Sequence, residues 1–160
     1  REKIVDMIYQ NEIIWSCGYA CSAHGFQREA GNYEMDMLLT NVCKLMVTQI
    51  PYKISRIVDD IAGGIICTLP SAKDFKDEKL GPLMQKYLTT CDDVKVEDRF
   101  KVIRFLENIS MGLGSVSYKG ESMHGAGSPQ AQRIMIFRTG KLREKMKYAK
   151  ELLDIEDEED

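Results

Sequence analysis

VEDRFKVIRFLENISMGLGSVS, residues 96–117, carries the strongest helical signal in this chain. Its apolar side chains recur every three or four positions, a spacing that places them on one face of an α-helix. These are Val102, Phe105, Leu106, Ile109, Leu113 and Val116. The stretch therefore predicts one long amphipathic helix that buries this stripe.

The same spacing recurs on both sides of this segment. It predicts further helices over residues 2–23, 35–50, 54–62, 80–88 and 129–153. No segment shows the alternation of apolar and polar residues that is typical of strands. Several helices with apolar stripes predict an all-α fold, an antiparallel helical bundle.

Breaks between the helices are marked by proline and glycine. Pro51 predicts a kink or break, because proline has no amide hydrogen to donate within a helix. A loop is expected over the glycine-rich residues 120–127, followed by Ser128 as a helix cap and Pro129 in the first turn. We expect residues 1–155 to form a single helical domain.

The two ends of the chain carry separate expectations. The tail, residues 156–160, is entirely acidic and is expected to be disordered. The chain opens with Arg1 and enters a helical pattern with no capping residue before it. We therefore expect residue 1 to lie inside a longer polypeptide.

Composition excludes some classes of protein. The 160 residues are 44% hydrophobic, enough for a packed core, and the net charge of −3 disfavours a nucleic-acid binder. No run of apolar residues is long enough to predict a membrane span. An odd number of cysteines without a secretory pattern favours reduced thiols in a cytoplasmic protein.

Cys17-x3-Cys21-x2-His24 has the ligand types of a metal or cluster site. The two cysteines are one helical turn apart, so both thiols can point the same way. A buried helix face that carries two small thiols explains the same pattern. We favour that interpretation and expect no metal ligand here.

Three parts of the sequence resemble one known family. They are residues 15–23 (WSCGYACSA) with 30–33 (AGNY), residues 59–64 (DDIAGG) with 70–71 (PS), and residues 104–109 (RFLENI) with 121–135 (ESMHGAGSPQAQRIM). Together they resemble the C-terminal third of the 4-hydroxybutyryl-CoA dehydratases, whose wider relatives are flavin-dependent 4-hydroxyphenylacetate monooxygenases. The last of them is long and unusual, and it is the most specific.

The resemblance implies a fold, an activity and cofactors. The fold would be similar to the C-terminal helical domain of acyl-CoA dehydrogenases. The enzyme would be a homotetrameric lyase and isomerase that converts 4-hydroxybutyryl-CoA to crotonyl-CoA and also isomerises vinylacetyl-CoA. It would use FAD and a [4Fe–4S] cluster whose ligands lie upstream of this segment, so the segment alone is expected to be inactive.

The resemblance also implies site residues. Glu121 would be catalytic, because a desolvated carboxylate has a raised pKa that suits proton transfer. His124 would line the same site. The alternatives are a solvated glutamate and a structural histidine.

The segment from Asp60 to Gly64 looks like the element of acyl-CoA dehydrogenases that reaches the FAD of a neighbouring subunit. Gly63 and Gly64 would let backbone amides approach the pyrophosphate, and Arg56 would add a positive charge. Asp60 stands where those enzymes have glutamine, and it would bind ribose hydroxyls or orient Arg56. A helix end made by Gly63 is equally compatible with the pattern.

Two other functions stay open at this point. One is a flavin-dependent monooxygenase, which the segment from Glu121 to Gly127 disfavours. The other is a stand-alone helical interaction module, which the start of the chain disfavours.

Overall fold

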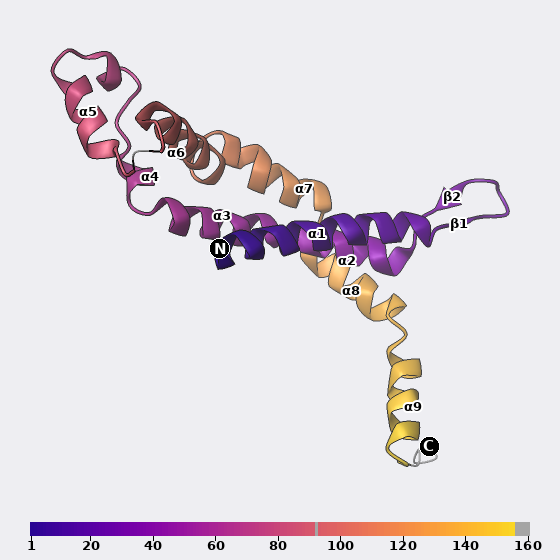
Figure 1. Ribbon diagram of the computed structural model, residues 1–160. Coiled ribbons are helices and arrows are strands. Elements are labelled where there is room, and N and C mark those ends of the chain that lie inside the picture. The colour runs from indigo at the N-terminus through magenta and orange to yellow at the C-terminus, as the bar shows by residue number, and fades with distance from the viewer. Residues whose placement is uncertain (92, 156–160) are drawn as a thin grey trace. The chain divides into compact units, whose positions relative to one another are not determined.

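The computed structural model describes residues 1–91 and 93–155 of the chain, and these are predominantly helical (Figure 1). The α-helices are α1 (Glu2–Ala23), α2 (Met37–Val47), α3 (Ile50–Ala62), α4 (Ile65–Thr68), α5 (Leu80–Leu88), α6 (Val96–Ser110), α7 (Ser122–Ala126), α8 (Pro129–Thr139) and α9 (Leu142–Leu152). A 3₁₀ turn, η1 (Asp74–Lys76), and a π-helical turn, η2 (Val116–Glu121), complete the helical elements. The predicted all-α class is confirmed.

A small hairpin lies in the polar stretch after α1. Its strands β1 (Phe26–Gln27) and β2 (Tyr33–Glu34) pair antiparallel, with Phe26 opposite Glu34 and Gln27 opposite Tyr33. It is the only sheet among the described residues. The sequence analysis did not predict it, because two residues in each strand are too few to show an alternating pattern.

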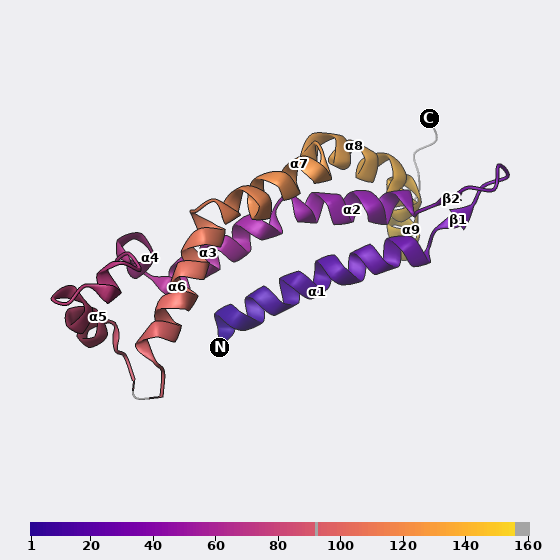
Figure 2. The ribbon, with the colours of Figure 1, turned by 90° about the horizontal axis from the view of Figure 1, so that it is seen from above.

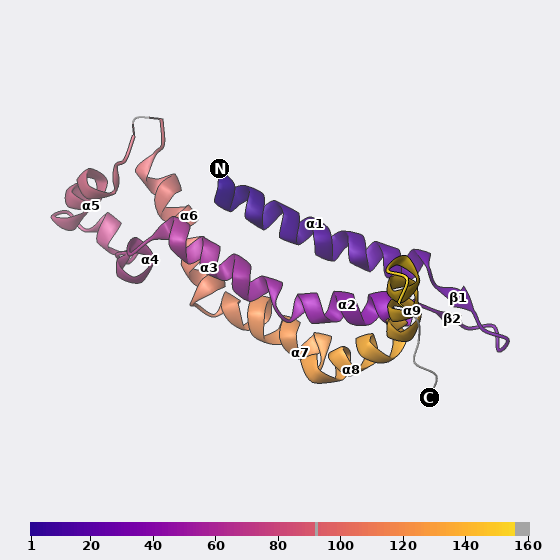
Figure 3. The ribbon, with the colours of Figure 1, turned by 90° about the horizontal axis from the view of Figure 1, so that it is seen from below.

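The chain divides into two compact units. Unit 1 comprises residues 1–7 and 51–122, and unit 2 comprises residues 8–50 together with the segment that begins at Met123. In unit 1, α4 and α5 both pack against α6. In unit 2, α2 lies between α1 and α8 (Figure 2 and Figure 3). The predicted acidic tail, residues 156–160, lies outside the described residues.

The break predicted at Pro51 and the helix start predicted at Ser128 are both present. Helix α2 ends at Val47, and α3 begins at Ile50 instead of the predicted Ile54, so that Pro51 falls in the first turn where its missing amide hydrogen costs nothing. Ser128 caps α8 by accepting a hydrogen bond from the Ala131 amide at 3.4 Å. Helix α5 also lies where its pattern predicts it.

The long helix predicted over residues 96–117 is wrong in its second half. Helix α6 ends at Ser110, because the Gly114 amide donates a hydrogen bond to the Asn108 side-chain Oδ1 at 3.1 Å and does not continue the helix. Gly112 and Gly114 leave room for this: a Cβ at Gly112 would lie 2.9 Å from the Asn108 Cα, and one at Gly114 would lie 2.8 Å from its Nδ2.

The residues after this break are helical as well. The expected loop over residues 120–127 is instead the end of η2 followed by α7. The helix predicted over residues 129–153 is interrupted too. Lys141 adopts a left-handed conformation with φ of 54°, and a Cβ on Gly140 would lie 2.6 Å from the Ile136 carbonyl oxygen. That clash requires glycine at position 140 and separates α8 from α9.

The buried face of α6 differs from the predicted stripe. The residues it buries are seven apart: Val96, Ile103 and Ser110. Val102 and Phe105 are more than half exposed, and Leu113 is 88% exposed. Burial of the whole stripe is therefore not achieved by the residues of this chain.

None of the helices in residues 1–91 and 93–155 is long and apolar enough to cross a membrane.

Candidate functional site

A polar cluster in unit 1 joins η2 to α3 and α6. Lys119 lies in η2, and its Nζ donates hydrogen bonds to Ser55 Oγ on α3 at 3.3 Å and to the backbone oxygen of Ser110 at the end of α6. Ser55 is only 6% exposed and Ser110 only 3% exposed. Hydrogen bonds from a charged donor to buried acceptors are stronger than neutral ones. The cluster therefore holds η2 firmly against both helices.

The Lys119 bond to Ser110 replaces one that the helix break removes. In a continuous α-helix the Gly114 amide would donate to the Ser110 carbonyl. Here the Gly114 amide donates to Asn108 instead, so Lys119 satisfies the carbonyl that is left. A cation at this place also interacts favourably with the C-terminal end of the α6 dipole.

Two more buried polar atoms lie on the residues that flank this cluster. Asp59 follows Ser55 by one turn of α3, and its Oδ1 is buried without a hydrogen-bond partner among the described residues. The hydroxyl of Ser110 is likewise buried without a hydrogen-bond partner among the described residues. A buried polar atom without a partner costs about 1–3 kcal/mol, so such atoms mark places where a partner from outside the chain is expected.

Glu121 is the last residue of η2, two positions after Lys119. A π-helical turn is rare and is found frequently at functional sites. The expected position in a glycine-flanked loop is wrong, because the carboxylate is carried by a helical turn. The side chain is exposed in this structure, so any desolvation must come from groups outside the described residues. His124 lies in α7, belongs to unit 2 and is also exposed.

The end of α3 carries the residues predicted to approach FAD. Gly63 has φ of +64°, and its amide donates to the Asp59 carbonyl at 2.8 Å, so it ends the helix as a C-terminal cap. Gly64 has an ordinary φ of −61°. A Cβ at either glycine would meet nothing within 4 Å. Packing within the chain therefore does not require glycine at position 64.

Arg56 and Asp60 are exposed on the same helix. Asp60 is not paired with Arg56: its Oδ2 contacts the Lys3 Nζ at 2.6 Å. Orientation of Arg56 by Asp60 is thus not what this structure shows. The Lys3 contact offsets the negative charge of Asp60 instead.

An apolar pocket of about 330 Å³ opens beside the end of α3. Its lining comes from α3, α4, α6 and the segment before α6, and comprises Ile61, Ala62, Ile65, Val94, Asp98, Arg99, Val102, Ile103 and Leu106. It contains residues on both sides of Gly63 and Gly64, and it is walled by part of the exposed stripe of α6.

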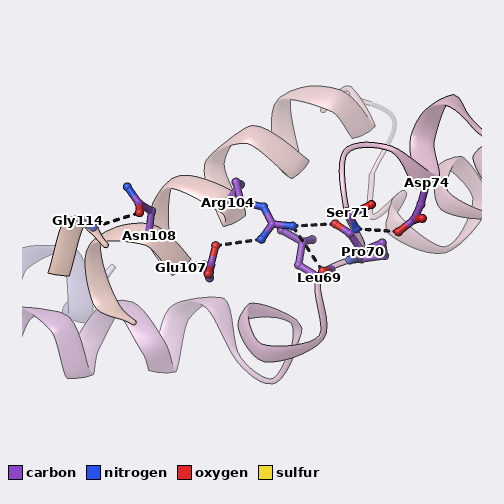
Figure 4. A network of polar contacts seen from close by, with 8 residues as sticks. All are labelled: Leu69, Pro70, Ser71, Asp74, Arg104, Glu107, Asn108 and Gly114. Carbon is purple, nitrogen blue, oxygen red and sulfur yellow. Dashed lines mark hydrogen bonds and ion pairs between the residues drawn. The ribbon is translucent and has the colours of Figure 1, made fainter. Parts of the chain in front are cut away.

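Arg104 fixes the loop after α4 to α6 (Figure 4). Its Nη2 donates to the Pro70 carbonyl at 2.8 Å and to the Leu69 carbonyl at 3.5 Å, while its Nη1 donates to Glu107 at 3.0 Å. The loop is tightened further by the Ser71 amide, which donates to Asp74 at 2.8 Å. Two stretches that the sequence analysis quoted separately, residues 70–71 and 104–109, therefore meet in one network.

The cysteines of unit 2 gather between α1 and α2. Cys17 and Cys43 are half-buried, Cys21 is buried, and the Cys21 thiol donates to the Gly18 carbonyl at 3.1 Å. Within residues 1–91 and 93–155 there is no group of three or more His, Cys, Asp or Glu side chains arranged to hold a metal ion.

Comparison with known proteins shows which family the chain belongs to. Residues 1–154 match the family described as 4-hydroxyphenylacetate 3-hydroxylase C terminal (HpaB). The chain belongs to this family. Within the HpaB family it is 46% identical to the 4-hydroxybutyryl-CoA dehydratase/vinylacetyl-CoA-Δ-isomerase of Clostridium aminobutyricum, over 97% of this chain and 33% of that protein.

Two solved structures are similar as well. An oxygen-tolerant archaeal 4-hydroxybutyryl-CoA dehydratase from N. maritimus is 46% identical and matches 98% of this chain and 31% of its own, with a TM-score of 0.88. The oxygenase component of 4-hydroxyphenylacetate 3-monooxygenase, complexed with FAD and 4-hydroxyphenylacetate, is 18% identical. It matches 96% of this chain and 32% of its own with a TM-score of 0.74, and at that identity it shows the fold alone.

The chain spans about a third of the length of these HpaB-family relatives. Sequence reasoning predicted roles for Glu121 and the glycine pair, which stay predictions, and it did not single out Lys119 or Ser55. These two residues are 64 positions apart, and only the packing of η2 on α3 brings them together. An isolated lysine two residues before Glu121 was the sole local signal.

Proposed function

We propose that this chain is the C-terminal helical domain of an enzyme that dehydrates 4-hydroxybutyryl-CoA to crotonyl-CoA and isomerises vinylacetyl-CoA. The observation that carries the proposal is 46% identity across 97% of the chain to a protein named for both activities. The solved archaeal dehydratase supports it at the same identity. The monooxygenase component, at 18% identity, supports the fold but not its own activity for this chain.

FAD is the first cofactor of the proposed enzyme, and the end of α3 fits it. Gly63 and Gly64 leave the backbone open to approach, and the exposed Arg56 offers a cation to a pyrophosphate. A carboxylate beside a phosphate is unfavourable, but Asp60 is paired with Lys3 at 2.6 Å, which reduces its effective charge. We propose that this segment meets the FAD of another subunit of a homotetramer.

The [4Fe–4S] cluster is the second cofactor, and we propose that its ligands belong to the part of the enzyme that precedes this domain. Together the two cofactors would supply the chemistry that makes an unreactive hydrogen of the acyl chain removable. The domain alone would then have no activity. Its exposed apolar residues, Val102, Phe105 and Leu113 among them, suit burial against the rest of the protein.

The residues of the chain itself would hold and move protons. We propose that Glu121 exchanges a proton with the bound acyl-CoA and that His124 lines the same site. Lys119 would act as a positioning residue, because it anchors the turn that carries Glu121. The rest of the enzyme would have to cover Glu121, since burial raises the pKa of a carboxyl group and suits it to proton transfer near neutral pH.

The test is Glu121→Gln in the full-length enzyme, prepared without oxygen. The amide keeps the shape of the side chain, so FAD and iron content should stay unchanged. Dehydration should fall by about 10²-fold or more, the usual scale for losing a positioned acid or base. Glu29→Gln, an exposed glutamate in the hairpin, is the matched control and should keep full activity. Retention of both activities within a few-fold in Glu121→Gln would make Glu121 a bystander.

The activity of the unmodified enzyme tests the proposal as a whole. Formation of crotonyl-CoA from 4-hydroxybutyryl-CoA is expected. Hydroxylation of 4-hydroxyphenylacetate with reduced flavin, without dehydratase activity, would favour the monooxygenase alternative instead.

A further inference from the structure

Two thiols that the proposed reaction does not use face each other between α1 and α2. Cys17 lies on α1 and Cys43 on α2, and both belong to unit 2. The Cys17 sulfur lies 3.5 Å from the Leu39 carbonyl oxygen, and the Cys43 sulfur lies 3.8 Å from the Ile14 carbonyl oxygen. Each thiol therefore contacts the backbone of the opposite helix about one turn from the other cysteine.

Cys43 lies opposite Gly18 of α1. A Cβ built on Gly18 would lie 3.9 Å from the Cys43 sulfur, so the thiol sits directly against the α1 backbone. The two thiols are close enough to influence each other's pKa. Thiols that lie near each other on facing helices can form a disulfide when their Cβ atoms come within about 4.5 Å.

We propose that Cys17 and Cys43 form a reversible intramolecular disulfide when the protein meets a peroxide. In the first step the thiolate of one of the two cysteines attacks one oxygen of hydrogen peroxide, giving a sulfenic acid and, after protonation of the leaving hydroxide, one water molecule. In the second step the sulfur of the other cysteine attacks the sulfenic sulfur, and the hydroxyl leaves with the proton of the attacking thiol as a second water molecule. Two thiols are oxidised, one peroxide is reduced, and α1 becomes covalently linked to α2.

Burial raises the pKa of both thiols, so both react more slowly with peroxide than an ordinary exposed cysteine.

A small oxidant has a route to the pair. Cys43 lines an apolar pocket of about 410 Å³ whose other walls are Ile14, Trp15, Gly18, Tyr19 and Ser22. Trp15 and Tyr19 at this pocket are mostly exposed. Cys21 is the nearest competitor, but its thiol donates to the Gly18 carbonyl within its own helix. Cys67 and Cys91 are exposed and belong to unit 1.

The experiment uses full-length protein, reduced and then treated with stepwise equivalents of hydrogen peroxide in the presence of a metal chelator. Remaining thiols are alkylated, and peptides are mapped by mass spectrometry without reduction. A cross-linked peptide pair containing Cys17 and Cys43 is expected, and a reductant should reverse it. Cys67→Ser and Cys91→Ser serve as controls and should leave the cross-link intact.

Single variants test the intermediate. Cys43→Ser and Cys17→Ser should each abolish the cross-link and leave a sulfenic acid at the remaining cysteine of the pair that reacts with dimedone. A circular dichroism spectrum like that of the unmodified protein establishes that each variant is folded, and the cross-link in the unmodified protein decides the question even where a variant misfolds. If Cys17 and Cys43 both stay alkylatable while Cys67 and Cys91 oxidise, or if Cys17 pairs with Cys21, the proposal is overturned.

Discussion

Replacing Lys119 with methionine should loosen the turn that carries Glu121. Methionine keeps the apolar stem of the side chain but removes the ammonium that bonds Ser55 and the Ser110 carbonyl. Losing a hydrogen bond to a charged group costs about 1.5–3 kcal/mol. Lys119 is only half-buried, so solvent screening favours the lower part of that range, and we expect a cost of about 2 kcal/mol in the stability of η2.

Amide hydrogen exchange of the folded full-length protein measures this cost locally. A loss of about 2 kcal/mol corresponds to an increase of roughly 30-fold in the open population. Peptides that cover residues 110–121 should therefore exchange up to that much faster, while peptides from α2 and α8 should be unaffected. Dehydration should fall in parallel, because Glu121 loses its fixed position.

The matched control is Lys101→Met on α6. Lys101 pairs with Asp98 at 3.1 Å, but both side chains are largely exposed, so the pair is worth less than about 0.5 kcal/mol. Exchange over residues 110–121 should not change. The reasoning is refuted if Lys119→Met changes exchange there by less than twofold, or if Lys101→Met has the same effect.

Three further outcomes are expected. Gly64→Val should lower flavin content, because its φ is ordinary and its Cβ would meet none of the described residues, so that a clash would come from a group outside them. Gly31→Val, at a strained φ of +87° in the hairpin, should leave flavin content unchanged. Joint replacement of Cys17 and Cys21 with alanine should leave iron content unchanged, and a loss of iron would place cluster ligands in this domain. Arg104→Met should raise the rate of amide hydrogen exchange over residues 69–74 by about tenfold. The Leu69 and Pro70 carbonyls would lose a charged hydrogen-bond donor worth about 1.4 kcal/mol. An unchanged exchange rate would mean that other contacts hold the loop.

Periodicity and capping residues were sufficient for most of the helices. The start of α8 could be predicted from Ser128 and Pro129, because the cap needs only local atoms. The end of α6 could not, since Leu113 and Val116 continue the apolar spacing beyond the break. The Asn108 side chain makes the break by bonding the Gly114 amide. Apolar periodicity cannot predict this bond, because it depends on a polar side chain and on glycines that leave room for it.

The sequence suggested candidate site residues but not the residues that hold them in place. Glu121 and the glycine pair follow from resemblance, whereas Lys119 and Ser55 meet only through folding. The orientation of α6 was also unpredictable. Apolar spacing shows that a face avoids water but not which partner covers it, and the relatives of this chain are about three times its length.

The π-helical turn that ends at Glu121 and the unpartnered hydroxyl of Ser110 have a common explanation. A continuous α6 would place the Ser110 carbonyl in an ordinary helical bond and would leave Lys119 without this role. With the break, the Ser110 carbonyl accepts a hydrogen bond from Lys119 instead. The buried hydroxyl of the same serine has no hydrogen-bond partner among the described residues. Such an arrangement is less stable than a regular helix, and it persists where the surroundings compensate for it. The π-helical turn, the Lys119 contacts and the unpartnered polar atoms of Asp59 and Ser110 all belong to unit 1, as does Glu121. This coincidence favours a site that the rest of the enzyme completes over a helix end that packing alone would shape.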